Sequence, residues 1–492
     1  MEKTAIKKRD FTEGKILKKL ILFAIPLALA SLVQKLFPAA DVAIIGQFAG
    51  SEYQAAIGST GTISSLLVDF FVGFSVGVNV LMANAHGAKD DERKERVLHT
   101  GITLALIAGI IVTVLGLVLS KPLLVALKTP DELIENATLY LTICFLGKPA
   151  TVVYNFGASI MRAVGESKRP LYYLSVAGVL NVLINIVTVV FFKWHVVGVA
   201  LGTILSMYLA SIWVLIDLIR GKAGVKLSFK KLRIHKKECK KILRIGLPMA
   251  INTSLFSVSN LLIQSNVNAF GKNAIAGKSI AANLESIIET FASAVMHGVV
   301  TFVGQNLGAK KEHRVHRIIG AGVVACAVWY AFSTAVLLAF GRYLCMVFNS
   351  DEAVIGWAMR RVLVMEVWMF TTIGSKAYGG ALKGMGKTLF PMLTNLFFTC
   401  IVRVGYLSFI YPNLPTQTYE GIYMIYPITW FLSSLVQTIV YYVLGAKHGH
   451  FKKPVLIAQP PQAMPTAEIK ETAICAETEV APTKEKEENI TE

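Results

Sequence analysis

The chain repeats itself once, and this repeat constrains the possible folds more than any other feature of the sequence. The Gly-Ala-Lys tripeptide at 87–89 recurs at 308–310, a separation of 221 residues. The lysine pair at 18–19 recurs at 240–241, a separation of 222 residues. One duplication across most of a chain of 492 residues predicts two similar lobes related by an internal repeat.

The composition indicates that lipid surrounds both lobes. Hydrophobic residues make up 54% of the chain and charged residues only 16%. Apolar runs of about 20 residues, long enough to cross a hydrocarbon core of roughly 30 Å, recur along the chain. Since lipid tolerates only helices or closed barrels, and these runs are too continuous for barrel strands, we expect an all-α integral membrane protein with six helices in each lobe. The twelve predicted spans are 17–45, 54–84, 97–120, 133–158, 169–192, 196–219, 242–269, 276–304, 316–341, 353–378, 388–411 and 421–445.

The net charge of +18 is better explained by membrane topology than by a nucleic-acid partner, because the basic residues are unevenly distributed. The N-terminus and alternate connecting segments carry 32 Lys and Arg residues, whereas the intervening segments carry 6. Positive residues concentrate on the cytoplasmic side of membrane proteins. We therefore expect a multi-pass protein of the cell membrane with both termini in the cytoplasm. Both Gly-Ala-Lys turns then face the cytoplasm, so the repeat is parallel.

Composition also divides the chain into segments. We expect a cytoplasmic N-terminus at 1–16, an N-lobe at 17–219 and a C-lobe at 242–445. The basic segment 220–241 is a predicted cytoplasmic linker, with room for a short interfacial helix against anionic headgroups. Residues 446–492, rich in Pro and Glu, are a predicted disordered cytoplasmic tail.

Nothing in the sequence indicates an enzyme or a nucleotide site. Residues 386–388 (Gly-Lys-Thr) resemble the end of a phosphate-binding loop, but the glycine required five positions earlier is Ala381. The segment also follows a membrane helix and not a strand. The six cysteines and nine histidines show no metal-ligand spacing, and no catalytic constellation is visible.

Polar residues inside the predicted N-lobe spans are candidates for a functional site, because lipid penalises them. Asp41 follows an intramembrane proline in the first span, and Asn181 and Asn185 lie one turn apart in the fifth. Asn155 lies in the fourth span and Thr203 in the sixth. Such a set suits a proton site or oxygen coordination of sodium. Taken singly, each amide or hydroxyl is better explained as interhelical packing, so only convergence on Asp41 would make a site.

The predicted C-lobe holds a second set of intramembrane charges. Glu285 and Glu289 lie one turn apart, so they could share a proton, or Glu285 could be solvated near the outer mouth. Lys148 in the N-lobe and Arg403 in the C-lobe are too central to reach the membrane surface easily. We expect each to pair with one of the carboxylates.

Several motifs together resemble the multidrug and toxic compound extrusion (MATE) family over roughly residues 15–445. The main ones are the repeated loops at 80–89 and 301–310, and the segment 301–309 (Thr-Phe-Val-Gly-Gln-Asn-Leu-Gly-Ala) is close to the usual family sequence. The Asp-Val-Ala-Ile-Ile-Gly segment at 41–46 resembles the first-helix motif of the family. The turns at 162–167 and 383–388 resemble those after its fourth and tenth helices.

This resemblance implies a secondary antiporter that exports drug-like, cationic or amphipathic compounds in exchange for protons or sodium, with no other cofactor. In the bacterial branch, Asp41 matches the coupling carboxylate, and Asn155, Asn181 and Thr203 match its polar neighbours. Asn185 departs from the pattern, since an Asp is frequent there. A sodium ion would be held by Asp41, Asn181, Asn185 and Thr203. We expect the protein to act as a monomer in the bilayer on small-molecule substrates.

Two other transporter classes share this two-lobed plan. A lipid-linked sugar flippase of the same superfamily commonly needs fourteen spans and a basic central cavity, so twelve spans and few central cations argue against it. A major-facilitator transporter would carry a signature loop after the second span, which is missing here. The sequence does not identify the compound that is carried.

Overall fold

The computed structural model describes residues 10–126, 129–221 and 224–448, without the side chains of 51, 62, 64–69, 254–262, 264–265, 268 and 445–448. The segment 1–9 and all of the predicted tail after 448 lie outside the described residues. Within the described part the chain is all-α, with no strand. This agrees with the fold class that the apolar runs predict.

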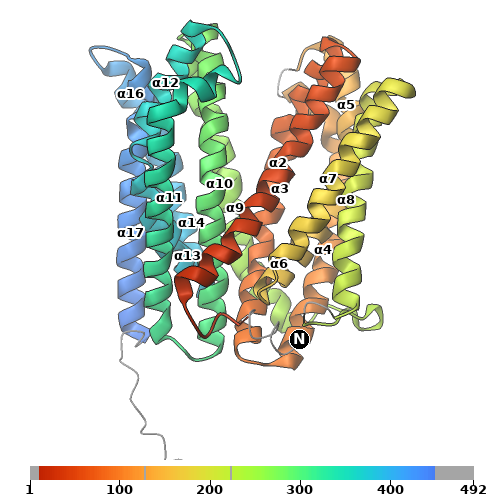
Figure 1. The fold of residues 1–492 in the computed structure, drawn as a ribbon, viewed down its shortest axis with the longest axis vertical. Helices are drawn as coiled ribbons and strands as arrows, with labels where there is room; N and C mark the ends of the chain where they lie inside the picture. The colour runs from red at the N-terminus through yellow and green to blue at the C-terminus, as the bar shows by residue number, and fades with distance from the viewer. Residues whose placement is uncertain (1–9, 127–128, 222–223, 449–492) are drawn as a thin grey trace, which may run out of the picture. The chain divides into compact units, whose positions relative to one another are not determined.

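The first six predicted spans are helical and form one group of helices, the N-lobe (Figure 1). Its elements are α2 (Ile16–Phe48), α3 (Ser51–Gly87), α4 (Asp91–Ala126), α5 (Asp131–Leu146), α6 (Lys148–Ala163), α7 (Lys168–Ile186) with the π-helical turn η1 (Val187–Phe191), and α8 (His195–Ile219). The fourth span is a bent pair, because α5 and α6 meet at 45° around Gly147.

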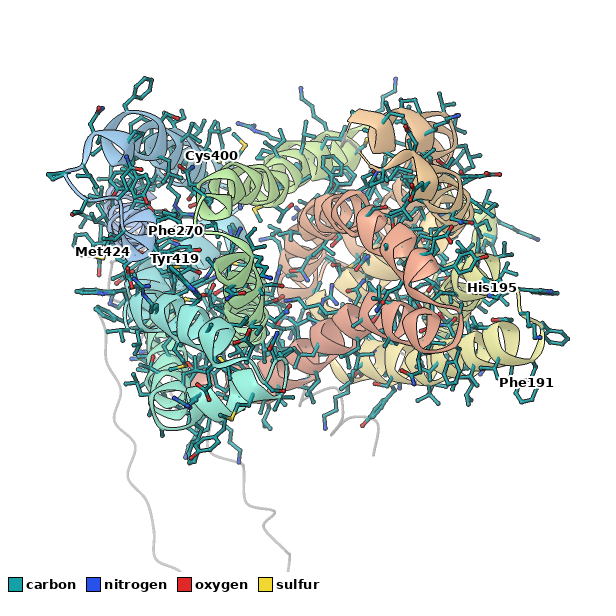
Figure 2. The ribbon with its side chains drawn as sticks, turned by 90° about the horizontal axis from the view of Figure 1, so that it is seen from above. Phe191, His195, Phe270, Cys400, Tyr419 and Met424 are labelled. Atoms are coloured by element: carbon teal, nitrogen blue, oxygen red, sulfur yellow. The ribbon has the colours of Figure 1, made fainter. Side chains whose placement is uncertain are left out.

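The other six predicted spans form the C-lobe. Its first elements are α9 (Lys236–Asn268), α10 (Lys272–Gly308), α11 (His313–Met346), α12 (Glu352–Glu366), η3 (Met369–Thr372) and α13 (Ile373–Gly384). The eleventh span comprises α14 (Leu389–Asn395), η4 (Leu396–Val402), α15 (Arg403–Gly405), η5 (Tyr406–Ile410) and η6 (Tyr411–Asn413), and the twelfth α16 (Tyr419–Tyr423) and α17 (Ile425–His448). In Figure 2, Phe191 and His195 mark the N-lobe, while Phe270 and Tyr419 mark the C-lobe.

Most of these helices qualify as membrane spans on their own. Among the described residues, nine helical segments are long and apolar enough, and the bent α5–α6 pair makes a tenth. The test covers α9 only in part, because the side chains of 254–262 lie outside the described residues. The α12–α13 segment is broken at η3 and carries several charges. The twelve-span plan therefore includes one described span, α12–α13, whose polarity needs a functional explanation.

The repeated tripeptide marks where the two lobes touch most closely. A Cβ atom on Gly87 would lie 1.8 Å from the carbonyl oxygen of Gln305 in α10. Reciprocally, a Cβ atom on Gly308 would lie 1.9 Å from the carbonyl oxygen of Asn84 in α3. Only glycine allows such backbone contact. The repeat thus places matching glycines on both sides of a nearly symmetric helix crossing.

The chain before α2 packs into the same end of the protein. Phe11 is buried, and its ring stacks on Phe302 with centroids 3.9 Å apart. The backbone N–H of Phe11 donates to Gln305 Oε1 at 3.1 Å, and Asn306 Nδ2 donates to the Phe11 carbonyl at 3.2 Å. Gln305 also donates to the carbonyl of Ala163 in α6 at 2.7 Å. Gln305 of α10 therefore links the segment before α2 to α6 through two hydrogen bonds.

The linker between the lobes is more structured than predicted. It contains a short 3₁₀ turn, η2 (Phe229–Lys231), and α9 already begins at Lys236, inside the range predicted as linker. The backbone N–H of Ser228 donates to His99 Nε2 at 3.1 Å, and that of His235 donates to Thr100 Oγ1 at 3.1 Å. The linker is thus held against the first turns of α4.

Candidate functional site

Asp41 lies at the centre of a polar cluster inside the N-lobe. Its side chain is 1% exposed, and its carboxylate accepts hydrogen bonds from three other helices. Asn185 Nδ2 of α7 donates at 2.7 Å and Thr203 Oγ1 of α8 at 2.7 Å. Tyr140 Oη of α5 donates at 3.1 Å and Asn181 Nδ2 of α7 at 3.4 Å. The structure therefore brings together Asp41, Asn181, Asn185 and Thr203, as the sequence hypothesis requires.

All four partners of this carboxylate are neutral. Among the described residues, no Lys, Arg or His side chain forms an ion pair with Asp41. A buried carboxylate without a cationic partner is costly at membrane depth. A mobile cation, either a proton or a metal ion, would supply the missing positive charge.

Local sequence explains how the helices converge on Asp41. Asn181 and Asn185 are four residues apart, so both face the carboxylate from successive turns of α7. Gly202 of α8 makes room for them, since a Cβ atom there would lie 2.0 Å from Asn185 Oδ1. The next residue, Thr203, then reaches both Asp41 and Asn181, whose Nδ2 donates to its hydroxyl at 3.2 Å.

The cluster also holds unused oxygen atoms. Asn181 Oδ1 and Asn185 Oδ1 are buried and have no hydrogen-bond partner. Buried amide oxygens are normally satisfied, so two orphans beside one carboxylate point to a missing ligand. Rotating each amide about its terminal bond would turn these oxygens toward Asp41. The carboxylate, two amide oxygens and the Thr203 hydroxyl fit the oxygen ligands that hard cations prefer.

One predicted member is not part of the cluster, and one actual member was not predicted. Asn155 is buried, but its amide donates to the carbonyl of Thr151 in its own helix at 2.9 Å. Tyr140 was not predicted, and its hydroxyl bonds directly to Asp41. No local pattern in the sequence distinguishes this tyrosine from the other fifteen.

The paired glutamates of α10 each have their own cation, and the alternative that Glu285 is solvated is wrong. Glu285 is 7% exposed and accepts two bonds from Arg361, from Nε at 2.8 Å and Nη2 at 2.7 Å. Glu289 pairs with Lys376 and accepts from Tyr330 Oη at 3.2 Å. Each carboxylate is therefore joined to a cation from another helix, and Glu285 is buried. Cations from α12 and α13 neutralise them instead.

The predicted pairing of Lys148 and Arg403 with carboxylates does not occur among the described side chains, which leave out 64–69. Within the described part of the chain, neither forms an ion pair. Arg403 Nε donates to Thr429 Oγ1 at 3.0 Å, and its guanidinium lies 3.9 Å from the ring centroid of Tyr426. An aromatic face thus takes the place of a carboxylate.

A cavity of about 1110 Å³ opens beside these charges, largely within the C-lobe. It is lined by α9, α10, α12, α13, the eleventh and twelfth spans and a short stretch of α3. Its cationic side chains are Lys278, Arg361, Lys376, Lys383 and Arg403, and its acidic ones are Glu285 and Glu289.

These cations correct the expectation that few lie centrally. Lys376 lies near the end of the predicted span 353–378 and Lys383 in the connecting segment after it, and the charge pattern counts both toward the cytoplasmic side. In the structure they belong to α13 and line the cavity. The argument against a flippase that rests on few central cations therefore fails.

Comparison with known proteins identifies the fold. A family model described as MatE matches residues 26–187 and 248–407, one stretch in each lobe. The chain belongs to the MatE family. Membership and the apolar helices together make it a multi-pass membrane transporter of small molecules. The two matched stretches also agree with the internal repeat.

Several MatE-family relatives are similar over most of their length. The chain is 25% identical to the probable multidrug resistance protein YoeA of Bacillus subtilis, covering 85% of this chain and 92% of that protein. It is 29% identical to the probable multidrug resistance protein YpnP of the same species, covering 81% and 89%. It is 23% identical to the multidrug export protein MepA of Staphylococcus aureus, covering 78% and 86%.

Solved structures show the same fold. A crystallised MATE protein in a bent conformation superposes with a TM-score of 0.84 at 20% identity, covering 91% of this chain and 99% of that one. An outward-facing multidrug resistance MATE family transporter gives a TM-score of 0.82 at 20% identity, with the same coverage. At this identity the likeness concerns the arrangement of helices alone.

Proposed function

We propose that this chain exports drug-like organic compounds across the cell membrane in exchange for a proton or a sodium ion that binds at Asp41. The observation that carries the proposal is a buried carboxylate with four neutral donors and no cationic partner in the described structure. Family membership, and relatives described as multidrug resistance and export proteins, support efflux of small molecules.

The ion site can accept either cation by small rearrangements. A proton would neutralise Asp41 and weaken the charge-assisted hydrogen bonds from Asn185 and Thr203. A sodium ion would instead draw the orphaned oxygens of Asn181 and Asn185 toward the carboxylate. In both cases the hydrogen bonds that Asn185 of α7 and Thr203 of α8 donate to Asp41 of α2 would change.

Helix α2 connects this site to the cavity of the C-lobe. Six residues before Asp41, Lys35 Nζ donates to Ser286 Oγ at 2.7 Å and to Thr290 Oγ1 at 2.8 Å. Ser286 lines the cavity and belongs to α10, which also carries Glu285. A movement of α2 caused by ion binding would therefore reach the wall of the cavity through α10.

The proposed orientation places both termini in the cytoplasm, as the distribution of Lys and Arg favours. Lys376 and Lys383 no longer count toward that distribution, but the bias of the remaining loops is still strong. We further propose that a single chain suffices, because the ion site and the cavity are both built from one chain.

Accumulation of fluorescent compounds in efflux-deficient cells tests the proposal. A panel of neutral, cationic and anionic dyes should accumulate less when the chain is expressed, for at least some members. Asp41→Asn keeps the size of the side chain but removes its charge, so we expect at least a tenfold loss of export at normal protein abundance. Asp131→Asn, at the exposed start of α5, is the matched control. Full export by Asp41→Asn across pH 6 to 8 would show that coupling lies elsewhere.

A further inference from the structure

The cavity of the C-lobe carries an excess of positive charge. Among the side chains that the structure describes, five cationic ones line it against two carboxylates, Glu285 and Glu289. Both carboxylates already hold a cation, Arg361 and Lys376 respectively. An organic cation entering the cavity would therefore have to displace one of these built-in partners.

The excess is specific to this lobe. At the repeat offset of 221 residues, four of the five cations correspond to neutral residues of the N-lobe. Lys278, Arg361, Lys376 and Arg403 correspond to Ile57, Tyr140, Asn155 and Val182. The two lobes share a backbone plan, so these charges are not required by the fold. A ligand that binds in the C-lobe and not in the N-lobe would explain them.

Arg403 is the clearest sign of a missing anion. Its side chain is 2% exposed, yet it lines the cavity. Nε donates to Thr429, whereas Nη2 is buried without any hydrogen-bond partner. A guanidinium has five N–H donors and stays charged in proteins, so an unsatisfied donor here is costly. Stacking on Tyr426 offsets part of this cost but offers no acceptor for Nη2.

Lys383 is a second buried cation on the cavity wall. It is 5% exposed, and the hydrogen bond that its Nζ makes goes to Met296 Sδ at 3.2 Å. A thioether is a weak acceptor and carries no charge. Both groups thus offer unused donor capacity to a ligand with negatively charged oxygens.

The rest of the wall suits an apolar body. The cavity also presents Met249, Ile263, Met365, Met369 and Trp430. Methionine and aromatic side chains adapt to varied apolar shapes, and the volume is that of a site for a drug-sized molecule.

We infer that this cavity binds organic anions, namely amphiphilic compounds that carry a carboxylate, sulfonate or phosphate group on an apolar body. Arg403 and Lys383 hold the anionic group, and the apolar side chains around Trp430 hold the body. The inference rests on the proposed export function and replaces the cationic substrates that the family resemblance implies.

Two dyes with the same fluorophore and opposite charge test the inference on the unmodified protein. Dansyl-glycine is an anion and dansyl-cadaverine a cation. The full-length protein is placed in nanodiscs of phosphatidylcholine, and binding is followed by energy transfer from tryptophan, including Trp430 on the cavity wall. We expect dansyl-glycine to bind about tenfold more tightly or better, as a buried charge-assisted hydrogen bond implies. Equal affinity, tighter binding of dansyl-cadaverine, or no binding of dansyl-glycine would overturn the inference.

Charge-removing variants assign the binding to the two cations. Arg403→Gln and Lys383→Met should each weaken dansyl-glycine about tenfold or more and leave dansyl-cadaverine no weaker. The matched controls are Arg342→Gln on the exposed face of α11 and Lys387→Met in the exposed turn after α13. A loss of affinity equal in the controls and in the cavity variants would overturn the assignment. The unmodified comparison remains decisive if a cavity variant fails to fold.

Two further arms identify the source of the anion and separate this inference from the export function. Competition by added phosphatidylglycerol would mean that the site takes anions from the bilayer, whereas its absence would mean that soluble anions are the ligands. Both results support an anion site. Export of cationic dyes that depends on Asp41, without preference for dansyl-glycine, would refute the anion site and leave the export function intact. Tight binding of dansyl-glycine without export of any dye would support the anion site and refute the export function.

Discussion

Replacing Glu285 by Gln should strongly destabilise the C-lobe, because it leaves a buried guanidinium without its counter-charge. The side chains of Glu285 and Arg361 are 9% and 7% exposed, and two hydrogen bonds of 2.7 and 2.8 Å join them. Removing one partner of a buried ion pair costs about 3–5 kcal/mol. The Arg361 guanidinium also lies 4.7 Å from the ring centroid of Tyr423, an interaction worth up to ~2 kcal/mol that survives the change. We therefore expect a loss near the lower limit, about 3 kcal/mol.

An exposed ion pair in the same lobe provides a control for the cost of removing the buried one. Arg342 and Glu352 are joined at 2.7 Å but are 59% and 61% exposed. Glu352→Gln should cost only ~0–1 kcal/mol, since water screens such pairs. The double variant Glu285→Gln with Arg361→Met removes both buried charges and should recover most of the loss.

The measurement is the free energy of unfolding of the purified protein in mixed micelles, from reversible titration with dodecyl sulfate. Suppose Glu285→Gln costs no more than the exposed control and the double variant is less stable than the single one. Glu285 would then already be neutral in the native protein. The reasoning from the ion pair would be refuted, and a proton shared between Glu285 and Glu289 would be the alternative explanation.

Three further predictions address the ion site, the topology and the lobe contact. Asn185→Asp would place a second carboxylate against the first, and since two adjacent carboxylates cannot easily both ionise, they should share a proton. Transport in proteoliposomes should then have a higher pH optimum and depend less on sodium, and an unchanged profile would mean that the amide does not act in coupling. In a chain without native thiols, a cysteine at Asn413 should react with an impermeant reagent added outside the cell, whereas one at Lys310 should not; the reverse pattern would invert the topology. Gly308→Ala should lower the free energy of unfolding by about 1–3 kcal/mol because its methyl group meets backbone of the other lobe, while Gly320→Ala, with no atom within 4 Å, should cost nothing.

Much of the fold could be predicted because lipid leaves the backbone few choices. Each apolar run had to become a helix, and the internal repeat required two lobes. The breaks within spans were harder to predict. The fourth predicted span bends at Gly147, and the tenth is interrupted at 367–372. A bend depends on how the neighbouring helices pack, which no local pattern records.

Some residues of the candidate sites could likewise be predicted from the sequence, and others could not. Asp41 and the amide pair of α7 could be found because a charge in an apolar run and an i,i+4 spacing are visible in one dimension. Tyr140 and the partner of Glu285 could not, because both contacts join helices separated by many residues: 99 residues separate Tyr140 from Asp41, and 76 separate Arg361 from Glu285. Lys383 was misplaced for a different reason. Its charge agrees with a cytoplasmic turn as well as with a cavity wall, and only the course of α13 distinguishes the two.

The opposite charge preferences of the two centres have an energetic consequence. In the proposed mechanism, Asp41 binds a cation that enters the cell, and the cavity around Arg403 binds an anion that leaves it. Exchange of one external cation for one monovalent organic cation moves no net charge. Entry of a cation together with exit of a monovalent anion moves two positive charges inward, each worth about 2.3 kcal/mol per 100 mV of membrane potential. An anion exporter built in this way would gain roughly 4.6 kcal/mol per 100 mV from an inside-negative potential alone. It could therefore concentrate its substrate outside the cell more than a thousandfold, as every ~1.4 kcal/mol is a factor of ten, without any chemical gradient of the coupling ion. Under this mechanism a single carboxylate in the N-lobe would be sufficient, because the membrane potential acts on both charges. The second acidic residue that the family resemblance implies at position 185 would then not be needed to drive transport.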